Sequence, residues 1–302
     1  FRRFIAGEDG VVRRWLRLGA SGWRLDVADE LPDDFIKEIK EASLREKPDA
    51  FLLGEVWEDA SVKIAYEKRR TYLLGDELDG VMNYPFREAV LAYLLRQDAE
   101  AFRDILSQIS ENYPYPAQRS LMNLLGTHDT PRITSVLGGA EEIAPKDLDA
   151  RAEFRLPPEK RRLAIRRLKL ASILLFTHLG SPTVYYGDEG AMEGLEDPFN
   201  RAYFLPEEED RETLAHYRKL AEIRRKEPVF SSSRPAFREA KGARLSLAWR
   251  RGVGLLMNAG NGKEEFELPF DAEDLLSGRR IEKGKITLAP ISALLYRKAE
   301  RG

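Results

Sequence analysis

Apolar residues follow two alternating patterns along residues 1–227. The first pattern is a short continuous apolar run, which is typical of a strand that is buried on both faces. Such runs occupy residues 21–27, 51–56, 80–83, 120–126 and 183–186. In the second pattern apolar residues recur three and four positions apart, which is typical of an amphipathic helix. This pattern predicts helices at residues 9–19, 31–48, 59–69, 85–96, 102–109, 158–178 and 214–223.

The regular alternation of strands and helices predicts the fold class. It indicates five strand–helix units in an α/β protein whose parallel sheet is covered by helices. Beyond residue 228 the segments become shorter and are separated by Gly, Asn and charged turns. That pattern predicts an antiparallel β-sandwich of about 70 residues. We therefore expect two domains, residues 1–227 and residues 228–302.

Composition and charge exclude several functional classes. The chain of 302 residues is 43% hydrophobic and 33% charged, which suits a packed core with a hydrated surface. Its net charge of −2 gives no basic footprint for nucleic acid, and the absence of cysteine excludes disulfides and thiolate metal sites. The most apolar window, residues 168–180, is shorter than a membrane span and contains Lys169 and His178. A buried helix is predicted there, and no membrane partner is expected.

Acidic side chains stand at the C-terminal ends of three predicted strands. They are Asp26, Glu55 and Asp129. In an α/β barrel these strand ends meet at one face, so the three carboxylates should converge although they are far apart in sequence. Glycoside hydrolysis needs one carboxylate that attacks the anomeric carbon and a second that donates a proton. The pattern therefore predicts a pocket for sugar chemistry, with Arg24 and His128 beside the acids.

The neighbours of each acid suggest a division of roles. Arg24 lies two residues before Asp26 on the same strand face, and its positive charge should keep Asp26 ionised, as a nucleophile requires. Glu55 lies among apolar residues, which favour the protonated carboxyl group of a proton donor. His128 and Asp129 could bind sugar hydroxyls. A purely structural ion pair between Arg24 and Asp26 is the alternative for the first strand.

Further residues near these strands are open to two interpretations. Trp57 is either part of the core or a platform on which a sugar ring stacks, and Tyr84 either packs or binds substrate. Asp188 and Glu189 either contact substrate or organise their loop. The acids at positions 29 and 30 could be no more than a solvated helix start.

Three segments resemble signatures of a known enzyme family. They are GWRLDVADE (22–30), LLGEVW (52–57) and LLGTHDTPR (124–132). In this order they are similar to motifs of the α-amylase family, glycoside hydrolase family thirteen. The resemblance implies a retaining enzyme on a (β/α)8 TIM barrel.

The same resemblance implies a role for each matching residue. Asp26 would be the nucleophile at the end of strand four, Glu55 the acid/base at strand five, and Asp129 the transition-state stabiliser at strand seven. Arg24 and His128 would be the accompanying polar contacts with the substrate.

Other segments resemble one branch of that family. MNYPF (82–86), GSPTVYYGDE (180–189) and DPFNR (197–201) look most like neopullulanases, cyclomaltodextrinases and maltogenic amylases. In that branch an acid four residues after the nucleophile lines acceptor subsites, and Glu30 stands at that position. The implied activity is hydrolysis of α-1,4 glucosidic bonds in maltooligosaccharides, cyclodextrins or pullulan, with transglycosylation as a second outcome.

Two alternatives to this activity stay open. The same three carboxylates would serve an oligo-1,6-glucosidase or a glucanotransferase. Outside the enzymes, the chain could be a relative that only binds carbohydrate or acts as a scaffold. Such a protein would be expected to lack one of the carboxylates, and all three are present here.

One signature of the family is missing from the chain. The strand-three segment with its Asp and its Asn-His pair is not found, so we expect residues 1–227 to hold only strands four to eight, within a longer protein. The N-terminal domain that mediates dimerisation in relatives of this branch is missing too. A homodimer is therefore expected only for a complete protein that contains this domain. No cofactor is expected to be required, and the usual calcium ligands of the family would lie largely in the missing segments. Because no export signal is visible, we expect a cytoplasmic location.

Overall fold

The computed structural model describes residues 1–299 and divides into two compact units. The first unit comprises residues 1–86 and 106–123, and the second comprises residues 87–105 and the chain from residue 124 onward. Two helices, α4 (Tyr84–Arg96) and α5 (Ala99–Asn112), contribute residues to both units.

Four parallel strands run through the first unit. They are β1 (Gly22–Leu25), β2 (Phe51–Gly54), β5 (Gly80–Asn83) and β6 (Met122–Leu124). They pair in the order β1-β2-β5-β6, which confirms the strands predicted from the first four apolar runs. Gly22 allows the close approach of β2, since a Cβ atom at that position would lie 2.1 Å from the carbonyl oxygen of Phe51.

Helices that pack against the strands complete the core of the first unit. They are α1 (Arg2–Ala6), α2 (Val11–Arg17), α3 (Asp33–Glu46) and α6 (Tyr115–Arg119). Helix α3 begins after Pro32 and buries Phe35, Ile36 and Ile39 against the core, as its three-and-four spacing predicts. Leu52 and Val81 meet this stripe from the strands.

The prediction of a helix at residues 59–69 is wrong. The segment instead ends in a short antiparallel hairpin of β3 (Ile64–Ala65) and β4 (Lys68–Arg69). Val62, Ile64 and Tyr66 are all exposed and recur at every second position. This is a strand spacing, but over so few residues it cannot be separated from a helix pattern. The turn is made by Tyr66 and Glu67, which have left-handed φ angles of 52° and 62°.

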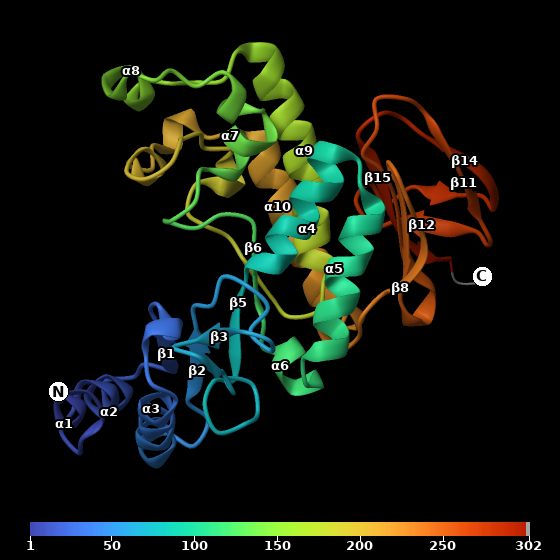
Figure 1. Ribbon diagram of the computed structural model, residues 1–302. Helices are drawn as coiled ribbons and strands as arrows, with labels where there is room; N and C mark the ends of the chain where they lie inside the picture. Colours follow the sequence, from blue (N-terminus) through green and yellow to red (C-terminus); the bar gives the residue numbers. More distant parts are fainter. Residues whose placement is uncertain (300–302) are drawn as a thin grey trace. The chain divides into compact units, whose positions relative to one another are not determined.

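The helices of the second unit surround α9 (Pro158–Thr177). Helix α9 contacts α7 (Ile133–Leu137) and α10 (Arg211–Lys226), and Figure 1 shows α9 and α10 side by side. The shorter helices and turns are η1 (Ala28–Glu30) in the first unit and η2 (Ala140–Glu142), α8 (Leu148–Ala152), η3 (Asp188–Gly190), η4 (Phe199–Arg201), η5 (Pro206–Glu208), α11 (Val229–Ser232) and η6 (Arg250–Gly252) in the second. Among residues 1–299, no helix is long and apolar enough to cross a membrane.

The last strand of the α/β pattern lies two residues earlier than predicted. It is β7 (Ser181–Thr183), whereas the apolar run suggested residues 183–186. The rings of Tyr185 and Tyr186, which follow the strand, lie against the guanidinium of Arg132, at 4.2 and 4.4 Å from the two ring centres.

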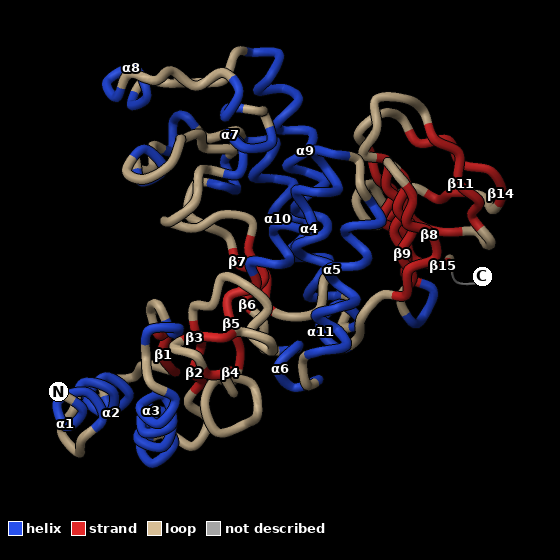
Figure 2. The backbone as a smooth tube through the Cα atoms, in the orientation of Figure 1, coloured by secondary structure: helices blue, strands red, loops and turns tan. Residues whose placement is uncertain are grey.

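Antiparallel strands fill the C-terminal part of the second unit, drawn in red in Figure 2. They are β8 (Ala236–Lys241), β9 (Arg244–Ala248), β10 (Val253–Asn258), β11 (Glu264–Leu268), β12 (Ala272–Asp274), β13 (Arg280–Ile281), β14 (Gly284–Leu288) and β15 (Ser292–Lys298). Six pair in the order β13-β12-β15-β10-β9-β8, and β11 pairs with β14. Leu256, Phe266 and Leu294 belong to one apolar cluster between them. The predicted domain boundary at residue 228 stays a prediction.

Candidate active site

The first group of predicted site residues lies at the ends of β1 and β2. These strands are parallel and adjacent, so the residues that follow them leave the sheet at the same edge. The backbone continues the pairing beyond the strands. The amide of Glu55 donates to the carbonyl of Leu25 at 2.9 Å, and the amide of Ala28 donates to the carbonyl of Glu55 at 3.1 Å. Asp26 and Glu55 are therefore positioned by the sheet itself.

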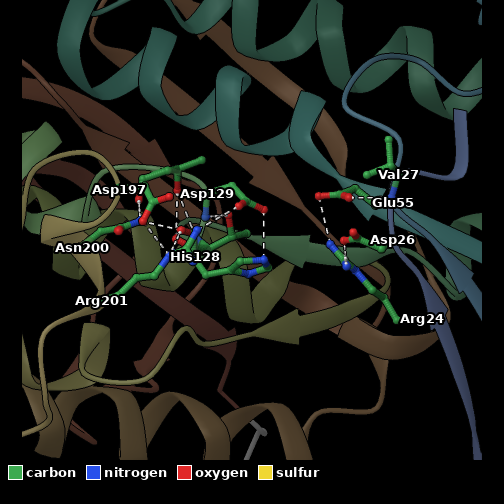
Figure 3. A network of polar contacts seen from close by, with 11 residues as sticks. Arg24, Asp26, Val27, Glu55, His128, Asp129, Asp197, Asn200 and Arg201 are labelled. Carbon is green, nitrogen blue, oxygen red and sulfur yellow. Dashed lines mark hydrogen bonds and ion pairs between the residues drawn. The ribbon is translucent and has the colours of Figure 1, made fainter. Parts of the chain in front are cut away.

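Arg24 lies between the two carboxylates, as Figure 3 shows. Its Nη1 contacts Oδ1 of Asp26, and its Nη2 lies 2.9 Å from Oε1 of Glu55. The side chain of Asp26 is 71% exposed, whereas that of Glu55 is 5% exposed. One acid is thus open to a ligand and the other is enclosed. The predicted pair of Arg24 with Asp26 is present, but the strand pattern carries no signal that the same guanidinium also reaches Glu55.

Val27 connects the two acids through its backbone. Its amide donates to Oε2 of Glu55 at 2.9 Å, so both oxygens of that carboxylate have a partner. Val27 adopts a left-handed φ of 44°, which is rare for a β-branched residue and costs about 1–3 kcal/mol. Strain of this kind persists where the surrounding structure fixes it, and here it aims an amide at a predicted catalytic group.

Two aromatic residues and one further acid belong to this group. Trp57 is 46% exposed and stacks on Tyr84, with ring centres 4.1 Å apart and ring planes 10° from parallel. Tyr84 is 3% exposed, so it supports Trp57 from the protein side. Glu30 is exposed and accepts a hydrogen bond from the hydroxyl of Tyr66. Direct binding of substrate by Trp57, Tyr84 and Glu30 stays a prediction.

The second group of predicted site residues lies in the loop after β6 and belongs to the second unit. Nε2 of His128 lies 3.2 Å from Oδ2 of Asp129. Nη2 of Arg201 lies 3.5 Å from Oδ1 of the same carboxylate and Nε of Arg201 lies 3.0 Å from Asp197 (Figure 3). Asp129 thus lies between the His128 ring and the guanidinium of Arg201, which donates to it. The predicted convergence of this carboxylate with Asp26 and Glu55 stays a prediction.

The side chain of Asn200 holds the backbone of this loop in place. Its side-chain amide donates to the carbonyls of His128 and Thr130, both at 2.8 Å, and the side chain is fully buried. Nε of Arg201 donates to the carbonyl of His128 at 3.0 Å. The segment around residue 200 therefore sets the position of a loop about 70 residues earlier in the chain.

A buried arginine lies behind the same loop. Arg132 is 0% exposed, and its Nε donates to the carbonyl of Asn200 at 2.8 Å. Its Nη1 donates to the carbonyl of Tyr186 and lies 3.4 Å from Asp188. Burial raises the pKa of Asp188 to about 7, against the opposing charge of Arg132. Asp188 is 2% exposed, which supports the interpretation that it organises its loop.

Sequence reasoning missed several of these anchoring residues. Asn200 and Arg201 occur in the segment DPFNR, whose main sequence signal is its resemblance to a branch of enzymes. The side-chain amide of Asn200 donates to backbone carbonyls, and because every residue has one, these partners cannot be recognised in a sequence. Among the described residues, no group of three or more His, Asp or Glu side chains is placed to hold a metal ion. The expectation that no cofactor is required stays a prediction.

Comparison with known proteins gives the relatives of the chain. The family model of the alpha amylase catalytic domain matches residues 5–219. A cyclomaltodextrinase of Geobacillus thermopakistaniensis is 32% identical over 305 residues, which cover 95% of this chain and 46% of the relative. Neopullulanase 2 of Thermoactinomyces vulgaris is 36% identical over 218 residues, covering 71% of this chain and 32% of the relative. The type III pullulan hydrolase from Thermococcus kodakarensis has a TM-score of 0.81 at 26% identity, covering 98% of this chain and 48% of that one.

These comparisons establish the class and then the family. The fold is of the TIM-barrel α/β type, the class in which catalytic groups stand at the C-terminal ends of strands. The chain belongs to the alpha-amylase family, glycoside hydrolase family thirteen, in the branch with cyclomaltodextrinases, neopullulanases and maltogenic amylases. The family predicted from the three signatures is confirmed. The chain spans less than half the length of the three relatives described here.

Proposed function

We propose that the complete protein is a retaining α-glucan hydrolase that cleaves α-1,4 bonds of maltooligosaccharides, cyclodextrins or pullulan. The observation that carries the proposal is the arrangement of Asp26 and Glu55 on neighbouring strand ends with Arg24 between them. Asp26 is exposed, as a group that attacks the substrate must be, and Glu55 stands beside it at the next strand end, as the second carboxylate of a glycoside hydrolase does. The names of the relatives, cyclomaltodextrinase and neopullulanase, support the same substrate class.

The proposed reaction proceeds by two displacements. In the first, a carboxylate oxygen of Asp26 attacks the anomeric carbon while Glu55 gives its proton to the leaving glycosidic oxygen. In the second, Glu55 takes a proton from water or from a sugar hydroxyl, whose oxygen attacks the anomeric carbon and releases Asp26. Asp129, held by His128 and Arg201, would bind hydroxyls of the sugar at the cleavage point.

The finer organisation is part of the proposal. Residues 1–227 would supply barrel strands four to eight and residues 228–302 a C-terminal sandwich, with strands one to three provided by the complete protein. The open edge of β1 is consistent with this, because β1 pairs only with β2 among the described strands. Dimerisation and a cytoplasmic location belong to the same proposal and rest on the family branch.

Substitution of the proposed nucleophile tests the mechanism. In the full-length protein, D26N should lower kcat on maltotriose on the order of 10⁴-fold, because the amide cannot form the covalent intermediate. D49N is the matched control, since Asp49 is an exposed carboxylate of the same unit, and it should retain wild-type turnover. Nuclear magnetic resonance of the first product should show the α-anomer. A β-anomer, or a D26N variant with wild-type turnover, would contradict the proposed mechanism.

Product analysis on pullulan tests the substrate assignment. Cleavage of α-1,4 bonds should release panose, whereas an α-1,6-specific enzyme would not. Panose formation that disappears in D26N would support the proposal.

A further inference from the structure

The second unit contains a cleft that none of the three predicted catalytic carboxylates lines. Its volume is about 930 Å³, which falls within the range of about 300–1,000 Å³ that is usual for small-molecule sites. Its lining comes from α4, α7, η2 and α9, and from residues near 146–151 and 195–196. The cleft is therefore large enough to hold a ligand of its own, apart from the proposed site of hydrolysis.

The spacing of residues along two helices builds opposite sides of this lining. On α4 the lining residues Arg87, Leu91 and Leu95 recur every four positions, and on α9 Lys160, Leu163 and Arg167 recur at three and four positions. Residues at such spacings share one face of a helix. Each helix thus presents leucines together with basic side chains to the same cleft.

The lining carries an excess of positive charge. Six basic and four acidic side chains contribute to it. Three of the acids are already paired within the lining: Glu88 with Arg87, Glu142 with Lys160, and Glu196 with Arg151. Among residues 1–299, three of the basic groups have no ion-pair partner, namely Arg96, Lys146 and Arg167. Only one acid of the described lining, Glu141, is left to balance them.

Arg167 is the most enclosed of these three basic groups. Its Nη1 donates to the carbonyl of Leu137 at 2.8 Å, and its Nε is buried with no acceptor in the described part of the chain. Burial lowers the pKa of Arg167, and no neighbouring carboxylate counteracts this effect. A guanidinium nevertheless keeps its charge at neutral pH. An anion in the cleft would supply the opposite charge that the protein does not provide.

The residue types of the lining restrict the kind of anion. No described residue of the lining is aromatic, so the cleft has no platform on which a neutral glucan or a nucleobase could stack. A bare phosphate ion would leave the leucines and Glu141 without a role. A phosphate ester of a sugar uses all of them, because its ring has apolar C–H faces and its hydroxyls donate to carboxylates.

We propose that this cleft binds a phosphorylated sugar. The guanidinium of Arg167 donates to the phosphate oxygens, and Arg96 and Lys146 contribute further positive charge. The leucines of α4 and α9 contact the sugar ring, and Glu141 accepts from a hydroxyl. No bond of the ligand is made or broken, so the site is a binding site that acts independently of Asp26, Glu55 and Asp129.

Calorimetric titration of the full-length protein with glucose 6-phosphate tests the site. This ester carries no leaving group at its anomeric carbon, so it cannot serve as a glycosyl donor. It should bind at least about tenfold more tightly than glucose, which lacks the charge, and about threefold more tightly than inorganic phosphate, which lacks the ring. Adenosine monophosphate should bind more weakly than glucose 6-phosphate, because its base finds no aromatic partner.

Three variants locate the binding in the cleft. R167Q should weaken binding of glucose 6-phosphate about tenfold, through loss of a charged donor. R96Q should weaken it about threefold, since an exposed charge contributes less. R162Q is the matched control, because Arg162 is an exposed arginine of α9 outside the lining, and its affinity should stay within about twofold of wild type. R96Q changes an exposed side chain and decides the matter if R167Q fails to fold.

Several results would overturn the inference. Wild-type affinity in both R167Q and R96Q would do so, as would an equal loss in R162Q, which indicates general surface charge. Tighter binding of inorganic phosphate or adenosine monophosphate than of glucose 6-phosphate would exclude a sugar ester. Loss of binding in D26N would place the ligand at the predicted nucleophile instead. The titration requires no turnover, so a protein that binds glucose 6-phosphate but cleaves no α-glucan contradicts the proposed function alone.

Discussion

The two groups of predicted catalytic residues are held in different ways. Asp26 and Glu55 stand directly at strand ends, and their contacts are local: one guanidinium, one amide and the backbone of the neighbouring strand. Asp129 stands in a loop, and residues far along the chain hold that loop through its carbonyls. The first group depends on the sheet, whereas the second depends on a buried polar network.

The difference predicts where each group is vulnerable. Changes at the first group should affect the geometry of the carboxylates and therefore mainly activity. Changes at the second group should remove buried hydrogen bonds and therefore mainly stability, because a buried polar group without a partner destabilises the folded state. The predictions below test this contrast in order of decreasing effect.

The largest effect is expected from Arg132. R132L should lower the free energy of unfolding of the second unit by about 3–5 kcal/mol, since it leaves the buried carbonyls of Tyr186 and Asn200 without their donor. Thermal unfolding followed by circular dichroism measures this. R218L changes an exposed arginine of the same unit and should shift stability by less than about 0.5 kcal/mol. Equal effects of the two variants would contradict the buried network.

Asp188 should make stability depend on pH. Its pKa is raised to about 7 in the folded protein by burial and is about 4 in an unfolded chain. The stability from this group is therefore full below about pH 4 and is lost as the pH rises through about 7, by up to about 4 kcal/mol. The melting temperature of wild type relative to D188N should fall between pH 5 and pH 8. A difference that stays constant over this range would show that Asp188 does not titrate there.

The sequence predicts the first group of site residues well and the contacts of the second group poorly. The apolar runs locate the ends of β1 and β2, so Asp26 and Glu55 could be placed from the chain alone. The partners of Asn200 and Arg70 are mostly backbone carbonyls. Because every residue has such a carbonyl, the sequence contains no pattern that reveals these contacts. The hairpin at residues 64–69 cannot be recognised from the sequence for a related reason. Its strands are only two residues long, so the apolar spacing around them does not separate a strand from a helix, and its turn uses Tyr and Glu in place of Gly.

At the first group, Arg24 should matter for activity more than for stability. R24Q removes the positive charge between Asp26 and Glu55, so kcat/KM on maltotriose should fall about 10²-fold through misplacement of the two carboxylates. R24K keeps the positive charge but loses the planar guanidinium that reaches both carboxylates. Its kcat/KM should lie between those of R24Q and wild type. R14Q, at an exposed arginine of helix α2, should retain full activity. A fall in melting temperature for R24Q as large as that for R132L would break the contrast between the two groups.

The smallest effect on stability is expected where the backbone is strained. V27G relieves a left-handed β-branched residue but adds freedom to the unfolded chain, and these opposing terms should cancel to within about 1 kcal/mol. Activity should nevertheless fall about tenfold, because a flexible residue no longer fixes the amide that bonds to Glu55. V62G, at an exposed valine of the same unit, should leave turnover unchanged. If V27G has wild-type turnover, the strain at Val27 has no part in positioning Glu55, and the strand ends alone are sufficient.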